Sequence, residues 1–346
     1  MATVKEVNKN IFKKLVEGTD INLDLFPSIR VFLTKEEHDR LASSLHVLSI
    51  YVFYRSVCFA LAEMEGVNFF VTIGLKDELS SPTLQPVDNK VELCLAVIDR
   101  CNIEKVQSAT ELMLEETVFT SNDIADIKWC VVEGCFPAIQ TYKITEEIGA
   151  TDEERTIYLK RLALFSLCYH KNLLILDFEQ DTLNTYLNLL NGGNYNIPID
   201  NILHSLGSNY WKFCYVDLYR CVERLYVMSW VHNYKTTLVS GLELHDMYEA
   251  LHKKFKIEKY ESMNLEHLFT LLKSSTNSIL GAVSNGMRSD NYIYDLRNKI
   301  VHYQKNEAEI ESIKESDWNV IVRFLLVAIM ELYPIFDSYI TALPEE

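Results

Sequence analysis

The hydrophobic and polar positions of the chain change their pattern near residue 200. Before that point, short apolar runs at residues 46–63, 68–74, 91–98 and 128–136 are rich in β-branched and aromatic side chains, which suits strands. Residues 151–170 instead show helical spacing after a threonine and an acidic first turn. The first part is therefore predicted to be an α+β domain.

Beyond residue 200, the apolar positions recur at helical spacing throughout. The pattern predicts five helices, at residues 208–231, 242–255, 264–280, 291–304 and 316–333. Pro334 is expected to end or kink the last helix, because proline lacks a backbone donor. Five helices with short connections imply an all-α helical bundle.

A polar segment separates these two parts. Residues 188–201 hold a Gly-Gly pair, several asparagines and a proline, a composition typical of a linker. A chain of 346 residues is also long for a single hydrophobic core. We therefore predict two domains, residues 1–200 and 201–346.

The composition favours a soluble cytoplasmic protein without a metal or cofactor. The first residues lack the apolar stretch of a secretory signal, and the longest apolar run, Val320 to Tyr333, is shorter than a membrane span and contains charges. The eight cysteines form no Cys-x-x-Cys pair, and no Cys/His cluster has the spacing of a zinc site. The chain also lacks a glycine-rich phosphate loop followed by a lysine.

The distribution of charge bears on nucleic-acid binding. The net charge is −16, whereas phosphate-binding proteins usually carry a basic footprint. Residues from 205 onward contain 15 basic and 19 acidic side chains, a net charge of −4, so the preceding residues carry the other −12. If the protein binds RNA, the second part is the better candidate.

Three polar side chains, Arg297, Asn298 and His302, interrupt the predicted helix 291–304. Asn298 and His302 lie one turn apart on one face, so Asn298 is expected to hydrogen-bond His302. Arg297 points about 140° away from His302, at the edge of the apolar stripe. That stripe consists of Ile293, Leu296, Ile300 and Tyr303.

Two interpretations of these polar residues remain open at this point. In the first, they are ordinary members of a folded bundle, with Arg297 paired to an acidic side chain and His302 hydrogen-bonded in the core. The acidic partners considered for Arg297 are Glu223, Asp217 and Asp295. In the second, the three residues form a catalytic site.

The hexapeptide RNKIVH, residues 297–302, resembles the signature of the HEPN superfamily, in which an arginine and usually a polar residue precede a histidine late in a helical bundle. The resemblance covers residues 205–346, and residues 208–231 are similar to the family's long first helix. It implies a HEPN-like bundle that acts as a metal-independent endoribonuclease and a homodimer. Many members are toxins or antiviral abortive-infection effectors coupled to a sensing element. Residues 1–200 are therefore expected to bind a protein partner or a small-molecule trigger.

The residue types suit the chemistry that the resemblance implies. RNA supplies its own nucleophile, the 2′-hydroxyl, so His302 would transfer the proton and Arg297 would hold the scissile phosphate. Asn298 would orient the imidazole, and the products would be a 2′,3′-cyclic phosphate and a 5′-hydroxyl. Because Arg297 and His302 diverge on one helix, a two-fold axis would join them from different subunits. The alternative is a non-catalytic HEPN-like protein that dimerises or binds RNA or a partner.

Overall fold

The computed structural model describes residues 3–19, 30–54, 56–101, 103–118, 126–191, 196–237, 261–301 and 307–341. The chain divides into two compact units, Met1–Ser166 and Leu167–Glu346. The division falls earlier than the predicted boundary at residue 200, because helix α7 (Gln180–Asn191) belongs to the helical unit. Asn319 of helix α16 (Glu315–Thr341) accepts a hydrogen bond from the backbone N–H of Glu179 at 2.8 Å and thereby holds the start of α7.

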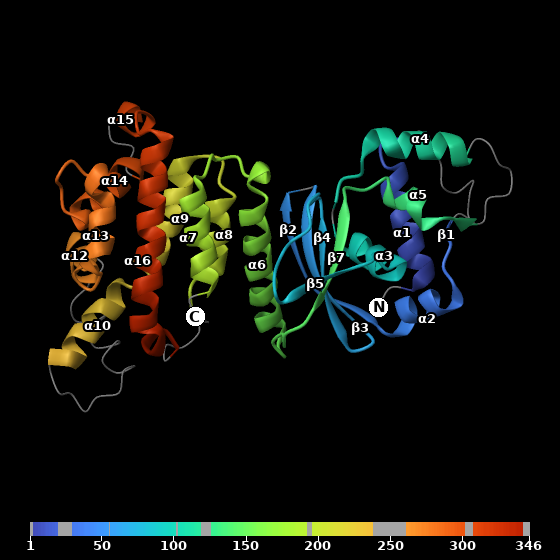
Figure 1. Cartoon of the computed structure of the whole chain (residues 1–346), viewed down its shortest axis with the longest axis horizontal. Helices are drawn as coiled ribbons and strands as arrows, with labels where there is room; N and C mark the ends of the chain where they lie inside the picture. The colour runs from blue at the N-terminus through green and yellow to red at the C-terminus, as the bar shows by residue number, and fades with distance from the viewer. Residues whose placement is uncertain are drawn as a thin grey trace. The chain divides into compact units, whose positions relative to one another are not determined.

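The first unit is α+β, as predicted, and is built on an antiparallel five-stranded sheet with the order β2-β3-β4-β7-β5 (Figure 1). Glu65 and Gly66 connect β3 to β4 in a two-residue turn, and both have positive φ, which suits the twist of a hairpin. The strands are β2 (Leu45–Tyr54), β3 (Val57–Met64), β4 (Val67–Ile73), β5 (Leu84–Val87) and β7 (Ile139–Ile144). The predicted strand regions 46–63 and 68–74 are confirmed.

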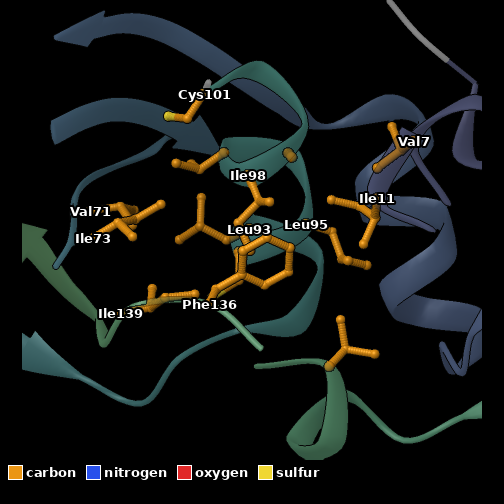
Figure 2. Close-up of a cluster of buried hydrophobic side chains, with 14 of the residues drawn as sticks. Val7, Ile11, Val71, Ile73, Leu93, Leu95, Ile98, Cys101, Phe136 and Ile139 are labelled. Carbon is orange, nitrogen blue, oxygen red and sulfur yellow. The ribbon is translucent and has the colours of Figure 1, made fainter. Parts of the chain in front are cut away.

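Helix α3 (Val91–Arg100) packs against β2 and β3 and against helix α1 (Val4–Val16), at the centre of the buried cluster in Figure 2. This helix corrects the strand predicted at residues 91–98. The cause is burial on every side, because a helix that is apolar all round loses its helical period. The fully buried side chains of α3 are Leu93, Cys94, Leu95, Val97 and Ile98.

A second predicted strand of this unit is also a helix. Helix α5 (Trp129–Glu133) replaces the strand predicted at 128–136, since five residues are too few to display a helical period. Helix α6 (Asp152–Tyr169) confirms the predicted helix, and Thr151 and Glu154 form its capping box. The other elements are α2 (Lys35–Ser43), α4 (Gln107–Val118) and the parallel pair β1 (Arg30–Val31) and β6 (Asp126–Ile127).

The second unit is helical, as predicted, and α16 runs through it (Figure 1). Helix α16 packs against α7, α9, α10 and α13. The helices that follow α7 are α8 (Ile199–Leu206), α9 (Trp211–Glu223), α10 (Tyr226–Thr237), α12 (Glu261–Thr270), α13 (Ser274–Ser278), α14 (Ser289–Val301) and α15 (Glu307–Glu311). The described part of this unit also contains two 3₁₀ turns, η2 (Lys171–Leu173) and η4 (Ile279–Ala282).

Three helix predictions need correction. The region 208–231 forms two helices, α9 and α10, and the region 264–280 is divided among α12, α13 and η4. Helix α16 does not end at Pro334 but continues to Thr341. A proline inside a helix costs about 3 kcal/mol, and the buried side chains of Phe336 and Ile340 beyond it favour continuation. The predicted helix 242–255 lies outside the described residues.

Within α16, Glu315–Ser338 is long and apolar enough to cross a membrane by length and composition alone, which corrects the shorter estimate from the sequence. Most of its apolar window, 61%, is buried inside the protein. Its charged residues also have protein partners: Arg323 lies 3.5 Å from Asp181, and Glu331 accepts a hydrogen bond from Thr276 at 2.9 Å. These contacts are typical of the core helix of a folded unit.

Candidate functional site around Arg297

Helix α14 is fixed by its apolar face, and Arg297 and Asn298 of the motif are half-buried beside it. Ile293 and Leu296 are buried, as the predicted stripe requires, while Ile300 is half-buried. The buried hydroxyl of Tyr215, on α9, donates a 2.6 Å hydrogen bond to the carbonyl of Ile293. This bond fixes α14 against α9 one turn before Arg297.

Arg297 lies between two carboxylates on neighbouring helices. Its Nη2 is 3.2 Å from Oε1 of Glu261, at the start of α12, and 4.0 Å from Oε1 of Glu223, at the end of α9. The Arg297 side chain is 14% exposed, so it is largely shielded from water. Glu223 is one of the acidic partners expected from the sequence, and the structure adds Glu261.

The other two acidic candidates are engaged with different cations. Asp295 pairs with Lys299 at 2.8 Å, one turn along α14, and Asp217 pairs with Arg220 at 3.5 Å on α9. The carboxylates that pair with Arg297 therefore come from α9 and α12. Three separate helices, α9, α12 and α14, contribute to the arrangement.

Asn298 is directed toward Arg297. Its Oδ1 accepts a 3.1 Å hydrogen bond from Nη1 of Arg297. The predicted bond from Asn298 to His302 is not tested, because His302 and Tyr303 lie outside the described residues. The structure thus brings together two of the three predicted site residues, Arg297 and Asn298.

Buried tyrosines give the Arg297 site a wall of low polarity. The hydroxyls of Tyr219 on α9 and Tyr226 on α10 hydrogen-bond each other. Burial raises the pKa of both phenols, and the positive charge of Arg297 partly opposes this for Tyr219. Burial likewise raises the pKa of the Glu223 carboxyl, and Arg297 opposes that increase. In such surroundings charges are weakly screened, so the interactions of Arg297 with Glu223 and Glu261 are strengthened.

An exposed aromatic group at the other end of α9 was missed by the sequence interpretation. The rings of Tyr210 and Phe213 meet edge to face with centroids 5.8 Å apart, and they are 61% and 51% exposed. The Lys212 ammonium lies 5.9 Å from the Tyr210 ring and 5.4 Å from the Phe213 ring. The sequence NYWKF (209–213) contains this signal, but it resembles the core-like aromatic runs elsewhere. Exposed aromatics beside a cation are the features of a stacking platform for single-stranded nucleic acid.

Several other candidates from the sequence add no site. Within the described ranges, no group of three or more His, Cys, Asp or Glu side chains lies close enough together to hold a metal ion. The sequence HKKFKIEK, residues 252–259, is basic enough to steer RNA or to be an ordinary solvated helix end, but it lies outside the described residues. Comparison of the chain with protein-family models, with curated proteins and with solved structures finds no match.

Proposed function

We propose that the protein is a metal-independent endoribonuclease of the HEPN type, an effector of the toxin or antiviral abortive-infection class. In this proposal Arg297 binds the scissile phosphate, and His302 transfers the proton of the attacking 2′-hydroxyl or protonates the leaving 5′-oxygen. Asn298 orients the groups around the phosphate. The first unit serves as the sensing or partner-binding element.

The environment of Arg297 is the observation that carries this proposal. A guanidinium that lies beside low-polarity tyrosine walls and is held by two partly exposed carboxylates is suited to exchange one anionic partner for another. An RNA phosphate would replace Glu261 as the partner of Nη2, because Glu261 and Glu223 are themselves 28% and 40% exposed and can be rehydrated. Asn298 remains beside the exchanged anion.

Cleavage of a labelled RNA by the purified full-length chain tests the proposal. Arg297→Ala and His302→Ala should each slow cleavage by about 100-fold or more, the usual contribution of a catalytic acid–base or charge-stabilising group. Lys299→Ala is the matched control, since it removes one positive charge from the same helix and should retain cleavage. Wild-type rates in both Arg297 and His302 variants would reject the proposal.

The proposed active species is a homodimer through the helical unit, with the motifs of two subunits facing each other. Arg297→Ala and His302→Ala chains, mixed and reassembled in equal amounts, should then recover about a quarter of the wild-type rate, since half of the dimers rebuild one of two shared sites. A monomer that cleaves RNA, or a mixture that stays inactive although heterodimers form, would contradict the shared site.

A second candidate function is a non-catalytic protein that binds RNA or a partner. The exposed pair Tyr210 and Phe213 with Lys212 favours it, because this group provides stacking and charge without any catalytic residue. The net charge of −16 also suits a protein that does not cut RNA. RNA binding without cleavage in the assay above would favour this second function.

A further inference from the structure

Two buried cysteines meet inside the first unit. Cys58 lies in strand β3, and Cys101 follows the last residue of helix α3. Their Sγ atoms are 2.7 Å apart, and the two residues are 0% and 1% exposed. Figure 2 shows Cys101 at one end of α3 with its sulfur turned toward the strands. All eight cysteines of the chain are free thiols in this structure.

The separation of these sulfurs is shorter than ordinary packing provides. Non-bonded heavy atoms in protein interiors pack at about 3.5–4.0 Å, whereas a disulfide bond is about 2.05 Å long. A closure of less than about 1 Å would bring the sulfurs to bonding distance. Because 43 positions separate the two cysteines, their proximity comes from the packing of α3 on β3.

A half-buried cation lies beside this cysteine pair. Nζ of Lys14, on α1, donates hydrogen bonds to the carbonyls of Cys101 at 2.6 Å and Asp99 at 3.1 Å. The positive charge of Lys14 favours the thiolate form of Cys58, which is the form that reacts with disulfides. The hydrogen bond to Cys101 and burial act the other way and raise the pKa of Cys58. Reaction is therefore slow and requires a transient opening of the fold.

We propose that Cys58 and Cys101 form a reversible intrachain disulfide when the protein meets a small-molecule disulfide such as oxidised glutathione. One cysteine thiolate attacks a sulfur of the oxidant and releases one thiol, and the second cysteine then attacks the resulting mixed disulfide and releases the other. The two cysteine thiols are oxidised, the oxidant is reduced to two thiols, and the two protons pass to these products. The inference is independent of RNA cleavage, because it involves only the first unit.

The disulfide would join the sheet to the end of the central helix of the first unit. A cross-link over 43 positions restricts the unfolded chain, and its entropic effect corresponds to a folded-to-unfolded ratio that is higher by about 10²–10³-fold. Oxidation would thus lock the packing of α3 on β3 in the proposed sensing unit, and a thiol reductant would release it.

Thiol counting with peptide mapping tests this inference on the full-length chain. The reduced protein is incubated with oxidised glutathione, denatured and alkylated, and its intact mass and proteolytic peptides are analysed. We expect two of the eight thiols to be lost, the Cys58 peptide to be linked to the Cys101 peptide, and unfolding to require more urea than in the reduced protein. Cys130→Ser, which removes the exposed cysteine, should still form the link.

Three outcomes would overturn the inference. One is full alkylation of all eight cysteines after prolonged oxidation. The second is a link between other cysteines or glutathione retained on Cys58 or Cys101, and the third is a Cys58–Cys101 link that leaves the urea midpoint unchanged. Cys101→Ser should form no intrachain link. If this variant does not fold, the peptide map of the wild-type chain still decides the question.

Discussion

The Arg297→Ala variant should remain folded, and the structure sets the cost of the substitution. At an effective dielectric constant of about 20, charges at the two observed separations, 3.2 Å to Glu261 and 4.0 Å to Glu223, attract by about 5 and about 4 kcal/mol before desolvation is counted. Much of this is offset, because both carboxylates are partly exposed and regain water when the arginine is removed. We expect a net loss of about 2 kcal/mol, between the values for exposed and fully buried pairs.

Urea unfolding at neutral pH, followed by circular dichroism, measures this loss. The free energy of unfolding should fall by about 2 kcal/mol, while the slope of this free energy against urea concentration stays unchanged. The matched control is Lys299→Ala on the same helix, whose partners Asp295 and Glu309 are 51% and 59% exposed. That variant should lose less than about 1 kcal/mol. A loss above about 4 kcal/mol for Arg297→Ala, or a chain that does not fold, would refute the reasoning and assign Arg297 a structural role.

Three further predictions concern other parts of the molecule. Arg40→Ala should cost about 3–5 kcal/mol, because it leaves the carboxylate of Glu92, 1% exposed and 2.6 Å from Arg40 Nε, buried without its partner. Burial raises the pKa of the Glu223 carboxyl above 4.5. This group therefore stabilises the fold below pH 4.5, and the contribution is lost as the pH rises through the raised pKa. Glu223→Gln should remove this pH dependence of the free energy of unfolding in urea titrations. Replacement of Tyr210 and Phe213 by alanine should weaken the binding of single-stranded RNA by about 1–3 kcal/mol per stacked base, measured by fluorescence anisotropy.

Each of these predictions has a control and a contradicting result. Replacing both Arg40 and Glu92 by leucine should cost less than Arg40→Ala, and an equal or larger loss would contradict the unpaired-charge argument. Parallel pH profiles for wild type and Glu223→Gln would show that this carboxyl does not titrate abnormally. Tyr169→Ala, which alters a tyrosine of similar exposure, should leave RNA affinity unchanged. An equal effect of Tyr169→Ala would argue against a specific platform.

The sequence predicted the class of each unit because several elements carry their signals locally, in their residue types. The β-branched and aromatic runs of β2, β3 and β4 and the capped start of α6 are such signals. Helix α3 was predicted as a strand because it is buried between the sheet and α1, and burial on all sides removes the periodicity. The polar segment at residues 188–201 does not mark the division between the units, because it lies between α7 and α8 within the helical unit.

The candidate site was only partly predictable for a related reason. Arg297 and Asn298 stand out locally, as polar residues beside the buried Leu296. Glu261 gives no local signal, since it contacts Arg297 only because α12 packs against α14. The exposed ring of Phe213 was likewise missed, because an apolar run does not reveal which side chains its helix leaves uncovered.

The measurement that tests the central claim most directly is the chemistry of the RNA ends after incubation with the purified chain in excess EDTA. We predict cleavage that persists in EDTA and leaves 2′,3′-cyclic phosphate and 5′-hydroxyl ends, and that is lost in both Arg297→Ala and His302→Ala. Cleavage that requires an added divalent ion, fragments with 3′-hydroxyl and 5′-phosphate ends, or the same fragments from both variants would contradict the account.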